Sequence, residues 1–146
     1  AIITLAPATR ALNDDELLSI RIPALVMAGT NDITTPIDPN VTRPWNQSAS
    51  TPSYRVDLAA AEHETFTDLC AYQAFLPTLS NPLQVVIDTI NERDEAGCGP
   101  EDMPIERAQA ITNTFAVAFL NETFKGGEMI KIDEVDQQSD LVFKAE

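Results

Sequence analysis

An unbroken apolar run from Ala24 to Ala28 constrains the fold of this chain more than any other feature. Pro23 precedes the run, Gly29 follows it, and no polar residue interrupts it. Such a run is typical of a strand that is buried on both faces, as in a parallel sheet with helices on either side. The sequence therefore predicts an α/β fold.

The rest of the chain alternates between strand and helix patterns, as this class requires. The remaining predicted elements are strands at 1–6 and 54–58 and helices at 15–20, 65–75, 83–93 and 105–124. The Pro-rich segment 33–53 is predicted to be a loop with at most a short helical turn. We expect residues 1–125 to form one domain portion and residues 126–146 to form an acidic C-terminal tail or an edge strand.

Two of the predicted helices carry apolar residues at the spacing of a core-facing stripe. In 83–93 these residues are Val86, Ile87 and Ile90. In 105–124 they are Ala108, Ile111, Phe115, Ala118 and Phe119. Both helices are therefore expected to pack against the sheet.

Composition argues against two classes of partner. The 146 residues include 23 acidic and 9 basic side chains, which gives a net charge of −14. A field of this sign repels the phosphate backbone of nucleic acids. No apolar run approaches the roughly 18 residues of a membrane-spanning helix. We therefore expect neither nucleic-acid binding nor a membrane span.

Asp32 and His63 are the candidate catalytic residues. Asp32 follows the predicted strand at 24–28, and His63, the only histidine, follows the one at 54–58. The carboxyl ends of adjacent parallel strands lie at the same edge of a sheet. There an aspartate can accept a hydrogen bond from one imidazole nitrogen and leave the other as a general base. The alternative is that Asp32 only caps a turn and His63 is an exposed loop residue.

The segments around both residues resemble those of α/β-hydrolases. Residues 22–36 (IPALVMAGTNDITTP) are similar to the segment that carries the triad acid, and residues 59–68 (AAAEHETFTD) to the one that carries the triad histidine. The resemblance extends over roughly residues 1–125, including the segment from Cys98 to Leu120. It is nearest to the branch of dienelactone hydrolases and platelet-activating-factor acetylhydrolases, close to polyester hydrolases.

The resemblance implies hydrolysis of a small-molecule or polymeric ester or lactone without a cofactor, with Asp32 orienting His63. The family's nucleophile is a Ser in a G-x-S-x-G turn, and none of the five glycines here flanks a Ser. We therefore expect the C-terminal part of an α/β-hydrolase fold that is incomplete and inactive without an N-terminal polypeptide. That polypeptide would supply the Ser and the oxyanion hole. The alternative is a non-catalytic structural or binding subunit of an extracellular assembly.

Cysteines and glycosylation motifs point to a secreted or periplasmic location. Cys70 and Cys98, the only two cysteines, are predicted to form a disulfide, with free buried thiols as the alternative. Asn40, Asn46 and Asn121 each begin an Asn-x-Ser/Thr triplet and are candidate glycosylation sites. One His and the absence of a CxxC pair give no support for a metal site.

Trp45 is a weaker candidate for substrate binding. It lies in the Pro-rich segment that follows Asp32. Aromatic side chains in such loops contact hydrophobic substrates. The alternative is that Trp45 anchors the loop to the core.

Overall fold

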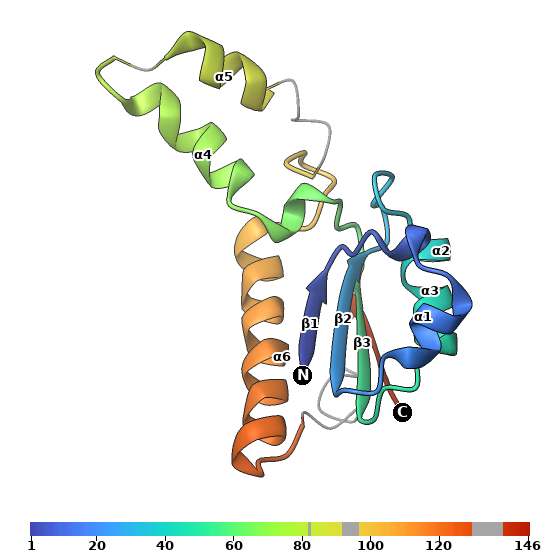
Figure 1. Ribbon diagram of the computed structural model, residues 1–146. Helices are drawn as coiled ribbons and strands as arrows, with labels where there is room; N and C mark the ends of the chain where they lie inside the picture. The colour runs from blue at the N-terminus through green and yellow to red at the C-terminus, as the bar shows by residue number, and fades with distance from the viewer. Residues whose placement is uncertain (82, 92–96, 130–138) are drawn as a thin grey trace.

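A four-stranded mixed sheet organises the protein, in the order β1-β2-β3-β4. The computed structural model describes residues 1–81, 83–91, 97–129 and 139–146 (Figure 1). Strands β1 (Ile2–Leu5), β2 (Ala24–Gly29) and β3 (Ser53–Leu58) are parallel, and β4 (Leu141–Ala145) runs antiparallel to β3. The predicted α/β class is confirmed. The parallel strands are as expected, and β4 makes the sheet mixed.

Helices flank the sheet on both sides (Figure 1). One face is covered by α6 (Ile105–Lys125), and the other by α1 (Asp14–Ser19), α2 (Ile37–Asn40) and α3 (Thr42–Gln47). Asn13 begins α1 with a capping box, in which its side chain and that of Glu16 satisfy each other's backbone N–H groups. The segment 33–53 thus contains two short helices, more than the single turn that was predicted.

The main core lies between α6 and the sheet. Ala108, Ile111, Phe115 and Phe119 are buried on α6, as the predicted stripe requires, and Ala118 is half-buried. Their partners on the sheet are Leu25, Met27, Tyr54, Val56, Leu58 and Phe143. The helix ends at Gly126, whose φ of 67° lies in the left-handed region and whose N–H donates to a carbonyl of the last turn.

The opposite face of β3 contains a buried ion pair. Arg55 and Asp57 are both buried, and Arg55 Nη2 lies 2.8 Å from Asp57 Oδ2. Arg55 also donates through Nη1 to Thr42 Oγ1 at the start of α3. Because a buried charge requires a partner, this pair explains how two charged residues fit a strand that is buried along its whole length.

Helices α4 (Leu69–Phe75) and α5 (Gln84–Asn91) project away from the sheet (Figure 1). The segment predicted as one helix at 65–75 contains the 3₁₀ turn η2 (Glu64–Phe66) and then α4. A second 3₁₀ turn, η3 (Leu76–Thr78), follows α4. The predicted core packing of Val86 is wrong, because this side chain is 39% exposed. Val86 lies on a helix that projects away from the sheet, whereas Ile87 on the same helix is half-buried. The side chain of Ile90 and residues 92–93 lie outside the described residues.

The sequence predicted either an acidic tail or an edge strand for the segment 126–146. Strand β4 lies in this segment and pairs with β3 at the edge of the sheet. An ion pair holds the start of β4 to α6, with Arg107 Nη2 3.0 Å from Asp140 Oδ1. This contact raises the pKa of Arg107, and it lowers the pKa of Asp140 despite partial burial. In the described part of the chain, no helix combines the length and the apolar character needed to cross a membrane.

Candidate functional site

A close approach of two loops forms the candidate site at the carboxyl ends of β2 and β3. Strand β2 ends at Gly29, where a Cβ atom would lie only 2.1 Å from the carbonyl oxygen of Ala61. Glycine is therefore required at this position. The N–H of Asn31 donates to that same Ala61 oxygen at 3.0 Å. This contact joins the loop that carries Asp32 to the loop that carries His63.

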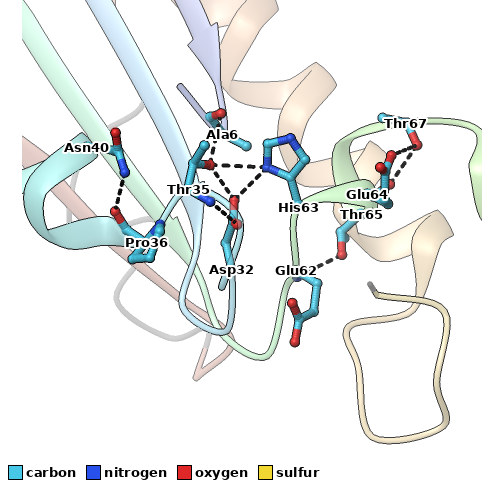
Figure 2. A network of polar contacts seen from close by, with 10 residues as sticks. All are labelled: Ala6, Asp32, Thr35, Pro36, Asn40, Glu62, His63, Glu64, Thr65 and Thr67. Carbon is cyan, nitrogen blue, oxygen red and sulfur yellow. Dashed lines mark hydrogen bonds and ion pairs between the residues drawn. The ribbon is translucent and has the colours of Figure 1, made fainter. Parts of the chain in front are cut away.

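Asp32 and His63 are in direct contact. Asp32 Oδ2 lies 2.9 Å from His63 Nδ1, and Figure 2 shows the imidazole turned toward the carboxylate. The Asp32 side chain is fully buried, whereas that of His63 is 30% exposed. Within the part of the chain that the structure describes, His63 Nε2 has no hydrogen-bond partner. The structure therefore brings together the two residues that the sequence singled out.

Thr35 completes the polar cluster, and sequence reasoning missed it. Its N–H donates to Asp32 Oδ1 at 2.7 Å, and its Oγ1 lies 2.7 Å from Asp32 Oδ2. The same Oγ1 is 3.1 Å from His63 Nδ1 and 3.1 Å from the carbonyl oxygen of Ala6 (Figure 2). The available signal was a Thr three residues after an Asp that follows a strand, because such an Asp can accept a hydrogen bond from a nearby backbone N–H.

These contacts keep the Asp32 carboxylate charged. Burial alone would raise the pKa of Asp32, because it disfavours the ionised form. Hydrogen bonds from the Thr35 N–H, from His63 and from the Thr35 hydroxyl outweigh burial and lower this pKa below its ordinary value. An ionised carboxylate oxygen only accepts hydrogen bonds, so this contact favours the ring form with the proton on His63 Nδ1 and the lone pair on Nε2. The pair is thus arranged as a general base with its orienting acid.

The turn that carries His63 is held by a hydrogen bond within it and by packing against the loop that contains Gly97. The N–H of Glu62 donates to Thr65 Oγ1 at 2.9 Å, which closes the turn around His63. Gly97, with a φ of 122°, packs so closely that a Cβ atom there would lie 2.7 Å from Thr65 Oγ1 and 2.8 Å from Glu62 Cβ. The loop that contains Gly97 therefore fixes the position of this turn.

A disulfide holds that loop in place. Cys70, on the first turn of α4, is bonded to Cys98 with an S–S distance of 2.06 Å. The predicted disulfide is confirmed. It connects the segment that follows His63 to the loop that precedes α6.

Acidic groups surround the site without forming a metal centre. Burial raises the pKa of Glu62, and the nearby carboxylates of Asp102 and Asp32 raise it further. Among the described residues, no group of three or more His, Cys, Asp or Glu side chains is placed to hold a metal ion.

A cleft of about 410 Å³ lies beside the His63 turn, between η2 and α6. Its lining includes the apolar side chains of Leu5 and Phe66 and the polar side chains of Thr67, Gln109 and Asn113. Neither Asp32 nor His63 lines this cleft, so it is a neighbour of the pair and not the space in front of it.

Trp45 does not lie with the pair. It is buried and lines a separate cavity of about 120 Å³ on the opposite side, together with Leu17, Val26 and Pro44. Neither Asp32 nor His63 lines that cavity. The structure therefore places Trp45 as an anchor of α3.

The three candidate glycosylation sites differ in solvent exposure. Asn46 is exposed and Asn121 is half-buried, whereas Asn40 is buried. The Asn40 side chain accepts a hydrogen bond from the N–H of Arg10. It also donates one to the carbonyl oxygen of Pro36 (Figure 2). Because a glycan on Asn40 would disrupt these buried contacts, the folded chain does not present this residue as an acceptor.

Comparison with known proteins matches the sequence to no protein-family model and to no curated protein. The functional argument therefore rests on the geometry of the site.

Proposed function

We propose that this chain supplies the acid and the histidine of a serine-type hydrolase that acts on carboxylic esters or lactones. The observation that carries the proposal is the 2.9 Å contact between Asp32 Oδ2 and His63 Nδ1, with Nε2 facing no described polar partner. A buried carboxylate that orients a half-exposed imidazole is the arrangement needed to activate a hydroxyl nucleophile. The resemblance of residues 22–36 and 59–68 to α/β-hydrolases agrees with it.

In the proposed reaction, His63 moves protons and Asp32 stabilises the charge that results. His63 Nε2 accepts the proton of a serine hydroxyl as the serine oxygen attacks the ester carbonyl. The imidazolium, stabilised by Asp32, then gives that proton to the leaving alkoxide as the acyl–oxygen bond breaks. Water attacks the acyl-enzyme in the same way, and His63 again takes and returns the proton.

The nucleophile and the oxyanion hole are assigned to an N-terminal hydrolase polypeptide outside these 146 residues. No serine among the described residues makes a hydrogen bond to His63. The two cysteines are joined to each other, so neither offers a thiolate. Thr35 faces Nδ1 rather than Nε2 and is buried. The proposal needs no cofactor, since a serine hydrolase uses none.

A secreted or periplasmic location is part of the proposal. The Cys70–Cys98 disulfide supports it, because such bonds persist in oxidising compartments. The exposed Asn46 is compatible with glycosylation there.

The test is a serine-reactive fluorophosphonate applied to the protein purified from its natural source, followed by denaturing mass spectrometry. We expect a second polypeptide, or a longer chain that contains this sequence, to gain the mass of the probe. A lone unlabelled species of about 15.9 kDa would exclude a serine hydrolase.

Two variants then connect the label to this chain. We expect His63→Ala to abolish labelling and esterase activity, and Asp32→Asn to lower activity by roughly 10⁴-fold. Asp38→Asn is the matched control, because Asp38 is an exposed carboxylate on α2. Full activity of His63→Ala would refute the proposal.

The alternative function, a non-catalytic binding subunit, is favoured by one observation. Helices α4 and α5 project from the body (Figure 1). They expose large apolar side chains, including Tyr72, Phe75 and Val86. Exposed large apolar side chains on a projecting pair of helices are a feature found at interaction surfaces. The unlabelled outcome of the fluorophosphonate test would favour this alternative.

A further inference from the structure

We propose that Thr35 is a positioning residue of the Asp32–His63 pair, whose hydroxyl fixes both the carboxylate and the proton-bearing nitrogen of the imidazole. Its consequence for catalysis rests on the proposed function, whereas its effect on the pair is measurable in this chain alone. Thr35 is 7% exposed, and its hydroxyl lies at the centre of the cluster in Figure 2.

The distances around Thr35 Oγ1 define which atom donates and which accepts. The hydroxyl has one proton and two lone pairs. Its shortest contact is 2.7 Å to Asp32 Oδ2, which as a carboxylate oxygen can only accept. The carbonyl oxygen of Ala6, the other possible acceptor, lies farther away at 3.1 Å. The hydroxyl therefore donates to Asp32, and its lone pairs remain for His63 Nδ1, also 3.1 Å away.

This arrangement places two acceptors in front of one imidazole nitrogen. Asp32 Oδ2, at 2.9 Å, and Thr35 Oγ1, at 3.1 Å, both face His63 Nδ1. A proton on Nδ1 satisfies both, whereas a lone pair there would meet the carboxylate oxygen in repulsion. Thr35 thereby reinforces the tautomer that leaves Nε2 as the base.

Turn formation alone does not explain the hydroxyl. The turn from Asp32 to Thr35 is closed by the Thr35 N–H, which any residue except proline supplies. The hydroxyl also lies 3.1 Å from the carbonyl oxygen of Ala6, directly after β1. Ala6 has a φ of 44° in the left-handed region, which is uncommon for a residue with a side chain. The Thr35 hydroxyl thus lies beside the end of a third strand, although its single proton goes to the nearer Asp32 oxygen.

The experiment compares variants of the chain by nuclear magnetic resonance. Thr35→Val keeps the shape and the N–H but removes the hydroxyl, and Thr35→Ser restores it. Thr34→Val is the matched control, because Thr34 is exposed next to Thr35. The chain contains one histidine, so the imidazole signals need no assignment among several. Two ionisable groups interact with Asp32, namely His63 and Glu62, and both are unchanged in every variant.

We expect Thr35→Val to move the midpoint of the Asp32 carboxyl titration to higher pH by up to about one unit, since one hydrogen bond to the ionised form is lost. The Nδ1–H proton should also exchange faster with solvent. Thr35→Ser should return both signals toward wild type, and Thr34→Val should change neither. Unchanged signals in Thr35→Val would overturn the inference.

A second measurement keeps the inference testable if Thr35→Val does not fold. Nitrogen chemical shifts of the wild-type imidazole report which ring nitrogen holds the proton. A proton on Nε2 in the neutral ring would overturn the inference without any variant. These results do not depend on a serine nucleophile. If the variants behave as expected but the fluorophosphonate does not label, the hydrolase proposal fails and the positioning role of Thr35 remains.

Discussion

Replacement of Gly29 by alanine tests whether contact between the two loops creates the Asp32–His63 pair. The new Cβ would lie 2.1 Å from the carbonyl oxygen of Ala61, where atoms closer than 3.0 Å must move apart. The obstacle is backbone, so no change of side-chain rotamer relieves it. The two loops must therefore separate by about 1 Å.

This displacement has a cost in both stability and geometry. Separation weakens the 3.0 Å hydrogen bond from Asn31 N–H to Ala61 O, a loss of about 1 kcal/mol. Strain and lost packing bring the expected destabilisation to about 2–4 kcal/mol. The Asp32–His63 contact of 2.9 Å would lengthen beyond hydrogen-bonding range. In an active assembly, a misplacement of this size costs roughly 10²-fold in rate.

Urea unfolding followed by the fluorescence of Trp45, the only tryptophan, measures the stability of Gly29→Ala. The Nδ1–H resonance of His63 measures the integrity of the pair. Gly126→Ala is the control: its φ of 67° makes alanine unfavourable by about 1 kcal/mol, but no atom lies within 4 Å of the new Cβ. If Gly29→Ala unfolds like wild type and keeps the Nδ1–H signal, the close contact of the loops is wrong.

Three further predictions concern bonds that the structure defines. Reduction of Cys70–Cys98, which are 28 residues apart, should lower the free energy of unfolding by about 3.5 kcal/mol. An identical urea midpoint with and without reductant would contradict this. Burial, and then its hydrogen bond to a carboxylate on α6, raise the pKa of Tyr54 to about 12, so Tyr72→Phe should show a tyrosinate absorbance midpoint at about pH 12. A midpoint near 10.0, the ordinary value, would count against the buried hydrogen bond. Because the pKa of Asp32 is lowered on folding, its contribution to stability is complete above the ordinary value of 3.8 and is lost as pH falls through the folded value. Asp32→Asn should flatten the acid limb of a plot of unfolding free energy against pH, and an unchanged limb would exclude this contribution.

Local patterns predicted much of the framework because they depend on short stretches of chain. The run from Ala24 to Ala28 indicated a doubly buried strand, and the stripe from Ala108 to Phe119 indicated a helix on the sheet. The same method failed at Val86, which has the spacing of a core residue but lies on a helix that projects from the body. Periodicity shows that a helix has an apolar face and does not show what that face contacts.

The residues of the candidate site also differ in whether the sequence could indicate them. Asp32 and His63 could be chosen from the sequence, because both follow predicted strands and adjacent parallel strands end at one edge. Thr35 could not be chosen, since its importance comes from contacts with Ala6 and His63, which are 29 and 28 residues away. The antiparallel pairing of β4 with β3 is equally non-local.

The sequence by itself determined the α/β class, the strand ends that carry Asp32 and His63, and the residues able to form a disulfide. Only the tertiary structure decided that the carboxylate meets Nδ1, that Thr35 joins them, and that Trp45 packs away from the pair. The physical reason is that hydrophobic patterning acts over a few residues. Hydrogen-bond geometry at the site instead depends on how polar atoms from the segments after three strands are brought within about 3 Å of one another.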